Sequence, residues 1–275
     1  NLSADQAGEL IRATSDNRYN LPSNLPYFEK LGKGRVNAFR ALSEESSAKS
    51  IRMDNFSYFG RNGQAAFSGD TITLEADFIN YLNPITQNGK IIISTRSPHI
   101  QILDSVFNVG AMIMMQQKNN ATRPFRFIVN QNTPLDLNIK FRLGFSDTNY
   151  SDYQYFEIPV NAPYLAIPFN TINFTLTGNG RAGYYDIYNR LGNGITSNNS
   201  QKLQEGGLIV GKSTAKVSDN VLTSMLGIEK DDDFKMIDIP RITEKTPFFT
   251  KATSKFADTL GAIVPPVGVH VKHTV

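Results

Sequence analysis

The sequence of 275 residues contains no cysteine, no tryptophan and only three histidines. The absence of cysteine excludes disulfides, cysteine-ligated zinc, iron–sulfur clusters and thiol nucleophiles. A zinc site made of histidine alone would need His99, His270 and His273 together, and His99 lies far from the other two in the sequence. No apolar run approaches the roughly 20 residues with which a helix spans a bilayer.

The charge is close to balanced, with 28 basic and 25 acidic residues and a formal net charge of +3. This balance disfavours nucleic-acid binding, which needs clustered Lys and Arg. Hydrophobic residues make up 40% of the chain, enough to form a packed core. The length corresponds to about two domains.

The beginning of the chain has helical character. Ser3 and Gln6 fit a capping box, and apolar residues then repeat at helical spacing through Thr14. After a proline-containing loop, residues 35–42 predict a second short helix, with Asn37 as a candidate N-cap. Two such short helices cannot bury their apolar faces alone. The apolar residues that need a partner surface are Leu10, Ile11, Val36 and Leu42.

From residue 51 the hydrophobic period changes to two, which is typical of strands. Turn residues such as Asn88-Gly89 separate the alternating segments, and no helical segment intervenes. Strands are predicted at residues 71–78, 90–95, 99–103, 125–129, 135–143 and 153–160. This pattern indicates an immunoglobulin-like β-sandwich.

Pro159, Pro163 and Pro168 mark a connector to a region rich in Gly and Asn. Strands are predicted there at residues 172–177, 207–211 and 267–271. The predicted fold class is therefore mainly β: the sandwich, followed by a second β-rich domain and preceded by two short α-helices.

One nucleotide-binding pattern matches in full. Residues 206–213 satisfy G-x-x-x-x-G-K-[ST], in which backbone N–H groups would hold phosphates and Lys212 would reach the terminal one. A phosphate loop needs a buried strand before it and a helix after it, whereas residues 197–205 are mostly polar and Leu, Ile and Val fill the loop itself. We therefore interpret this segment as a glycine-flanked strand, and we predict no cofactor.

An acidic cluster comprises Asp231, Asp232 and Asp233, with Glu229 and Asp238 nearby. Carboxylate oxygens could bind calcium, but the glycine and the distal glutamate of an EF-hand loop are missing. The cluster can be interpreted either as a solvated acidic turn or as a calcium site, and we favour the turn.

The remaining polar residues give no catalytic constellation. His270 and His273 would lie on opposite faces of a strand, which is awkward for joint metal ligation, and His99 fits a structural position at a strand start. No serine lies in a G-x-S-x-G elbow. We predict no catalytic, cofactor-binding or metal-binding residue in this chain.

The two helical segments carry a further signal. Residues 2–16 read LSADQAGELIRATSD, and residues 31–42 read LGKGRVNAFRAL, with Gly32 and Gly34 allowing a tight turn before the cap at Asn37. As a pair they resemble the C-terminal end of the catalytic domain of subtilisin-like serine proteases. The resemblance covers about residues 1–43 and departs from the family pattern at Ser15, where alanine is common.

This resemblance implies a parent protein whose nucleophile lies in a G-T-S-M-A motif upstream of the first helix, with the Asp and His of the triad further upstream. None of these motifs is in this chain, so the chain alone is expected not to be an enzyme. The region after Ser50 resembles the accessory β domains of Bacteroidetes-type subtilases, with a CARDB-like sandwich in the middle. Residues 173–233, with TGNGRAGY at 177–184 and LQEGGLIVG at 203–211, resemble the next region of those proteins. Such proteins usually continue past this point, so an end beyond Val275 is expected.

The predicted organisation has five parts. Residues 1–43 form the last helices of a catalytic domain, 44–50 a linker, 51–162 the sandwich, 163–171 a second linker and 172–275 a truncated β-rich accessory domain. The resemblance implies a non-catalytic region of an exported endopeptidase, extracellular or at the cell surface, whose β domains stabilise or position protein substrate. Its partners would be the upstream catalytic domain and that substrate, and neither nucleic acid nor a membrane span is expected. One alternative function is a stand-alone β-sandwich that acts as a binding or adhesion module. A second alternative, which rests on the phosphate-loop pattern alone, is a nucleotide-binding protein.

Overall fold

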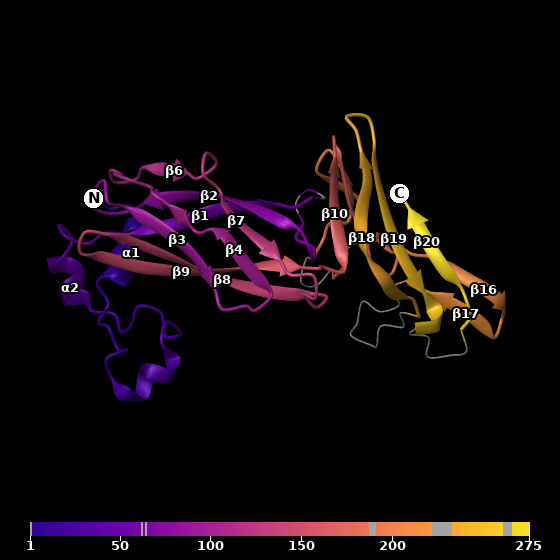
Figure 1. Ribbon diagram of the computed structural model, residues 1–275, viewed down its shortest axis with the longest axis horizontal. Helices are drawn as coiled ribbons and strands as arrows, with labels where there is room; N and C mark the ends of the chain where they lie inside the picture. The colour runs from indigo at the N-terminus through magenta and orange to yellow at the C-terminus, as the bar shows by residue number, and fades with distance from the viewer. Residues whose placement is uncertain (1, 62, 64, 187–190, 222–232, 261–265) are drawn as a thin grey trace. The chain divides into compact units, whose positions relative to one another are not determined.

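The chain divides into two units, each with its own core (Figure 1). The computed structural model describes residues 2–61, 63, 65–186, 191–221, 233–260 and 266–275. Unit 1 comprises residues 1–132 and 138–158, and unit 2 comprises residues 133–137 and 159–275. Within the described residues, no helix combines the length and apolar character that crossing a membrane requires.

Unit 1 begins with α1 (Ala4–Ala13), the 3-10 helix η1 (Pro22–Tyr27) and α2 (Ala38–Ser43). The predicted capping box is confirmed, because Ser3 and Gln6 exchange side chain to backbone hydrogen bonds at the start of α1. Asn37 is confirmed as the N-cap of α2 and accepts a hydrogen bond from the backbone N–H of Arg40. Both helices therefore begin at residues that satisfy otherwise unpaired N–H groups.

The first sheet of unit 1 is antiparallel, with the strand order β1-β2-β7-β4 and β6 paired to β2. Its strands are β1 (Ile51–Phe59), β2 (Thr71–Asn80), β4 (Ile100–Asp104), β6 (Gln117–Asn119) and β7 (Phe125–Val129). Burial alternates strictly along β2, as the period of two predicts.

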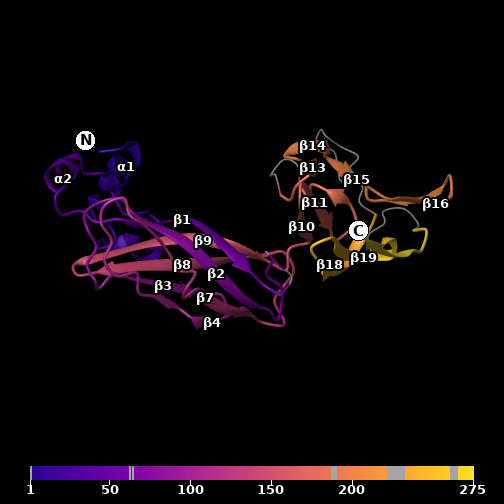
Figure 2. The ribbon, with the colours of Figure 1, turned by 90° about the horizontal axis from the view of Figure 1, so that it is seen from above.

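The second sheet of unit 1 is also antiparallel and has the order β5-β3-β8-β9. Its strands are β3 (Lys90–Thr95), β5 (Val106–Phe107), β8 (Leu137–Asp147) and β9 (Tyr150–Val160). Figures 1 and 2 show α1 and α2 near the end of the unit where β8 turns into β9.

Phenylalanine rings fill the space between the two sheets. Phe78 of β2 lies 6.4 Å from Phe145 of β8, and Phe127 of β7 lies 4.8 Å from Phe141 of β8, centroid to centroid. All four rings are fully buried, and each contributes about 1.5–3 kcal/mol through removal of apolar surface from water. This core makes unit 1 a β-sandwich.

Side chains close one seam of the sandwich. Gln154 of β9 accepts a hydrogen bond from the backbone N–H of Met53 (2.9 Å) and donates one to its carbonyl (3.1 Å). The edge strands β1 and β9 are thus joined through an amide side chain where no ladder pairs them. The backbone groups of Met53 are satisfied in this way at an edge that would otherwise be open.

Unit 2 is built from antiparallel sheets as well. One sheet has the order β14-β13-β11-β12-β15 with β10 on β11, another the order β18-β19-β20, and β16 pairs with β17. The strands are β10 (Tyr164–Phe169), β11 (Ile172–Thr177), β12 (Ala182–Gly183), β13 (Ile195–Ser197), β14 (Ser200–Leu203), β15 (Glu205–Gly206), β16 (Ile209–Ser213), β17 (Lys216–Asp219), β18 (Lys235–Lys245), β19 (Thr250–Ala257) and β20 (His270–Thr274), with a 3-10 turn η2 (Asp258–Leu260).

A close backbone approach marks the core of unit 2. Phe234 and Phe256 pack edge to face, 5.2 Å apart. Gly180, at a positive φ of 86°, lies against Phe256, and a Cβ there would come within 1.9 Å of the ring. Glycine is therefore required at this position for both conformation and space.

The predicted fold class is confirmed: the chain is mainly β, with several antiparallel sheets and few helices. The ranges 90–95, 125–129 and 172–177 coincide with β3, β7 and β11. Within the range predicted as the second linker, Tyr164–Phe169 form β10. The contacts place the N-terminal helices in the same unit as the sandwich.

Candidate functional site

The segment that joins α1 to α2 forms a closed loop, which we call the strap (residues 17–34). Backbone hydrogen bonds between Asp16 and Arg35, at 2.8 and 3.0 Å, close its two ends. Gly34 lies at this closure with φ 120°, and a Cβ there would stand 1.9 Å from the carbonyl oxygen of Asp16. The glycines predicted to allow a tight turn are thus confirmed in that role.

A buried tyrosine organises the inside of the strap. The Tyr19 hydroxyl donates to the carbonyl of Gly32 (2.8 Å) and accepts from the N–H of Leu31 (2.9 Å). Its ring packs against Phe28 at 5.1 Å. One side chain therefore fixes the two arms of the strap relative to each other.

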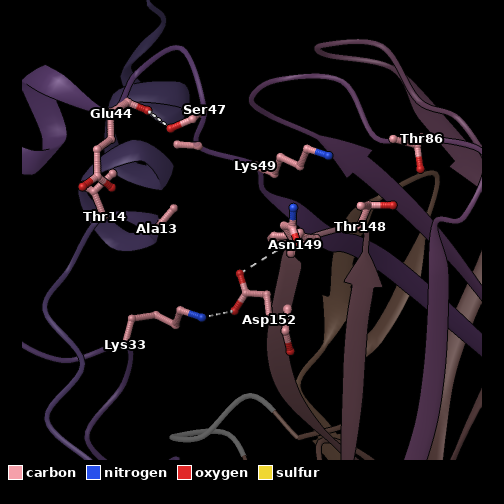
Figure 3. Close-up of a pocket in the computed structure, with 13 residues that line it drawn as sticks. Ala13, Thr14, Lys33, Glu44, Ser47, Lys49, Thr86, Thr148, Asn149 and Asp152 are labelled. Atoms are coloured by element: carbon pink, nitrogen blue, oxygen red, sulfur yellow. Dashed lines mark hydrogen bonds and ion pairs between the residues drawn. The ribbon is translucent and has the colours of Figure 1, made fainter.

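An ionic cluster, which we call the inner latch, joins α1 and the strap to β9. The Asp152 carboxylate accepts hydrogen bonds from Arg12 at 2.6 and 3.1 Å. It also forms an ion pair with the Nζ of Lys33 at 2.9 Å, which Figure 3 shows. Arg12 also donates to Glu9 (2.6 Å) and to Ser50 (3.0 Å), and the Ser50 hydroxyl donates to Glu9. The Asp152 side chain is almost fully buried.

The electrostatics of the inner latch keep both sides charged. Burial alone would raise the pKa of Asp152, but the hydrogen bonds and charges of Arg12 and Lys33 outweigh burial and lower the pKa. Burial would likewise lower the pKa of Arg12, and its hydrogen bonds to Asp152 and Glu9 raise it instead. The cluster is therefore a structural ion pair network rather than a proton donor or acceptor.

A second contact, the outer latch, holds the middle of the strap. Glu29 accepts hydrogen bonds from the guanidinium of Arg142 at 2.5 and 2.7 Å and from the Tyr155 hydroxyl at 2.7 Å. The hydrogen bond from Arg142 is the largest cause that holds the pKa of Glu29 below its usual value. Glu29 adopts a positive φ of 59°, which costs free energy in a residue with a Cβ and persists only where contacts impose it.

A third contact lies between the two latches. The Tyr153 hydroxyl donates to the carbonyl of Gly32 (2.7 Å), and its ring is flanked by Lys33 at 5.6 Å and Arg142 at 5.4 Å. Cations near an aromatic face contribute about 0.5–2 kcal/mol each. The strap is thus held to the outer face of the second sheet by polar and cation–aromatic contacts.

A pocket of about 480 Å³ lies beside the inner latch (Figure 3). Its charged lining groups are already engaged: Lys33 binds Asp152, Lys49 binds Asp147 at 2.6 Å, and Glu44 binds Arg40 at 2.7 Å. Since every charge in its lining has a partner within the described chain, this pocket offers no free ion-binding group.

The helix α2 presents an apolar face to solvent. Phe39 and Leu42 of α2 are 79% and 85% exposed, and Val36, directly before the N-cap, is 63% exposed, so the three follow one another at a spacing of three residues. Ala41, on the opposite side, is 7% exposed and packs inward. Of the four apolar residues predicted to need a partner surface, Leu10 is buried in unit 1, whereas Ile11, Val36 and Leu42 are exposed.

The phosphate-loop pattern forms a β-hairpin. Residues Ile209–Ser213 are β16, which leads directly into its antiparallel partner β17 (Lys216–Asp219) rather than into a helix. Lys212 is exposed on this hairpin. The interpretation of the segment as a strand is confirmed, and the geometry of a phosphate loop is absent from it.

The acidic cluster is only partly described. Glu229, Asp231 and Asp232 lie outside the described residues. Asp233 is buried and accepts a hydrogen bond from the N–H of Asp219 at 3.1 Å, and Asp238 lies 3.8 Å from Arg241. Among the described residues, no group of three His, Asp or Glu side chains is placed to bind a metal ion.

The histidines occupy separate positions. His270 and His273 lie in β20 on opposite faces, as predicted, and the Nδ1 of His273 lies 2.9 Å from the carbonyl of Gly180. His99 directly precedes β4, and its carbonyl accepts a hydrogen bond from Asn130. The structure does not bring these three described residues together as a metal site.

No protein-family model matches the sequence, and no curated protein matches it.

Proposed function

We propose that this chain is the non-catalytic C-terminal region of an exported, extracellular or cell-surface subtilisin-like serine endopeptidase. In this proposal α1 and α2 complete the catalytic domain, and the immunoglobulin-like sandwich with the β-rich unit behind it stabilises or positions protein substrate. The sequence resemblance of residues 1–43 motivates the proposal.

The observation that carries the proposal is the exposed apolar face of α2 on an anchored segment. Three ionic and polar contacts fix the helices and the strap to the sandwich. Val36, Phe39 and Leu42 nevertheless point to solvent, and clustered large apolar side chains on a soluble protein mark an interaction surface. These contacts fix the position of the exposed face, so a partner can bind it. The resemblance implies that this partner is a catalytic domain that lacks its last two helices.

Complementation tests this proposal. A subtilisin-like catalytic domain truncated before its last two helices, taken from the coding sequence upstream of residue 1, is co-expressed with this chain. We expect a complex that hydrolyses peptide substrate and reacts with a fluorophosphonate probe, whereas this chain alone forms no adduct. Leu42→Asp should abolish the complex, and Phe248→Asp, at an equally exposed position in unit 2, should leave it intact.

Equal complex formation by Leu42→Asp and Phe248→Asp, or no complex with the unaltered chain, would contradict the proposal. A stoichiometric serine adduct on this chain alone would contradict its non-catalytic character.

A second candidate function is a stand-alone binding or adhesion module of the bacterial surface. The observation that favours it is the depth to which the N-terminal segment is built into unit 1: Ser50 and Asp152 are buried beneath α1. A monomeric chain that resists proteolysis throughout and binds no catalytic domain would favour this second function.

A further inference from the structure

The outer face of the second sheet carries a groove of about 500 Å³ beside the outer latch. Its volume falls within the roughly 300–1,000 Å³ of typical ligand pockets. The strap supplies Phe28, Glu29 and Lys30 to its lining, and the sheet region supplies Arg96, Lys140, Arg142 and Tyr155. Every one of these residues lies in unit 1.

The groove has a surplus of positive charge. Four cations line it against one carboxylate, and that carboxylate, Glu29, is bound by Arg142. Lys30, Arg96 and Lys140 are exposed and form no ion pair with any residue in the described chain. An anionic ligand would therefore meet three exposed cations that no ion pair of the described chain engages.

The chain itself shows how this surface binds a carboxylate. Glu29 receives two hydrogen bonds from Arg142 and one from Tyr155, which is the geometry of a recognised acidic side chain. The charge of Arg96 acts on the same carboxylate and helps to lower its pKa. A second acidic group in the groove would meet the same kind of environment.

The aromatic rings decide between an acidic peptide and an acidic polysaccharide. Sugar rings bind by stacking on free aromatic faces. The Tyr155 ring has the Lys140 ammonium over it at 4.9 Å, and Tyr153 packs against it edge to face at 5.8 Å. The Phe28 ring packs against Tyr19 at 5.1 Å, and its exposed part offers an apolar contact for a side chain. These features favour a peptide.

We propose that this groove binds an extended acidic segment of another polypeptide, with Lys30, Arg96 and Lys140 pairing with its carboxylates and Phe28 contacting an apolar side chain. The site needs only unit 1 and no catalytic domain. Its occupancy is therefore tested separately from the protease assignment.

Fluorescence anisotropy of the full chain tests the site. The probe is a fluorescein-labelled oligoglutamate peptide at low ionic strength, with an oligoglutamine peptide of the same length as the uncharged control. We expect saturable binding of oligoglutamate only. The double variant Arg96→Glu/Lys140→Glu should bind about tenfold more weakly or worse, because two attractions become repulsions.

The matched control is Arg123→Glu, an exposed cation that precedes β7 in the other sheet and should leave the affinity unchanged. Unchanged melting temperatures show that all variants fold. Equal weakening by Arg123→Glu would overturn the site, as would equal binding of oligoglutamine. Tight binding of a heparin oligosaccharide without binding of oligoglutamate would overturn the assignment to a peptide.

Discussion

Arg12 of α1 and Asp152 of β9 lie 140 positions apart and form a two-point ion pair, with Nη2 and Oδ2 separated by 2.6 Å. The pair links the first helix of the chain to an edge strand of the sandwich. Since the Asp152 side chain is almost fully buried, its charge depends on Arg12 and Lys33 for compensation. The N-terminal helix is thus a structural part of unit 1.

Removal of the buried carboxylate should destabilise unit 1. In Asp152→Ala, Arg12 and Lys33 remain without their shared anion, and breaking a buried pair costs about 3–5 kcal/mol. Urea unfolding followed by circular dichroism measures the change. The control is Asp104→Ala, whose partner Arg126 is half-exposed, and it should cost less than about 1 kcal/mol. Equal losses in the two variants would contradict the role of the inner latch.

The outer latch should make stability depend on acid pH. The folded pKa of Glu29 is lowered, chiefly by the hydrogen bond from Arg142, relative to an unfolded value of about 4.3. Its contribution is therefore full above the unfolded pKa and is lost as the pH falls through the folded pKa. Glu29→Gln should be less stable by about 1–2 kcal/mol at pH 7, and this difference should shrink below about pH 4.

Urea unfolding at a series of pH values measures that difference. A gap between wild type and Glu29→Gln that stays constant from about pH 7 to about pH 3 would show that the charge of Glu29 contributes nothing.

Much of the fold can be predicted from local pattern. The capping box at Ser3, the cap at Asn37 and the strict alternation along residues 71–78 each specify a local structure that tertiary contacts then retain. The hairpin strand within residues 206–213 is also predictable, because its apolar residues suit a strand.

The latches cannot be predicted in the same way. Their partners are 113 and 140 positions apart, and sequence spacing carries no information on such pairs. One signal is present in the sequence: Asp152 occupies an inward position in phase with Phe156 and Ile158, and a charge on a core face needs a partner. The strand predicted from the alternating pattern begins at residue 153 and does not include this carboxylate.

The exposed face of α2 should tolerate charge where its inner face does not. Leu42→Asp introduces a carboxylate into solvent and should change the unfolding free energy by less than about 0.5 kcal/mol. Ala41→Asp, one position earlier, buries an unpaired charge and should cost several times more. Thermal unfolding compares the two, and similar losses would show that Leu42 is packed in this chain.

The hairpin at Lys212 should bind no nucleotide. A ligand that binds only the folded state raises the melting temperature, so ATP with magnesium should leave it unchanged. Differential scanning fluorimetry measures this. A saturable upward shift that disappears in Lys212→Ala would establish a site in spite of the strand geometry.

The outer latch should also protect the strap from proteolysis. Chymotrypsin can cleave at Tyr27, Phe28 and Leu31, which are exposed but held near the sheet by Glu29. Arg142→Ala removes two of the three hydrogen bonds to Glu29, and a loss of about 1.4 kcal/mol in the free energy of local opening accelerates cleavage about tenfold. The control Arg126→Ala removes a guanidinium from the other sheet and should leave the rate unchanged. Early cleavage within residues 22–34 in the Arg142 variant, with α1 still bound through Asp152, would show that the outer latch can open while the inner latch stays intact. Equal rates in both variants would show that the contacts of Lys33 with Asp152 and of Tyr153 with Gly32 hold the strap without the outer latch.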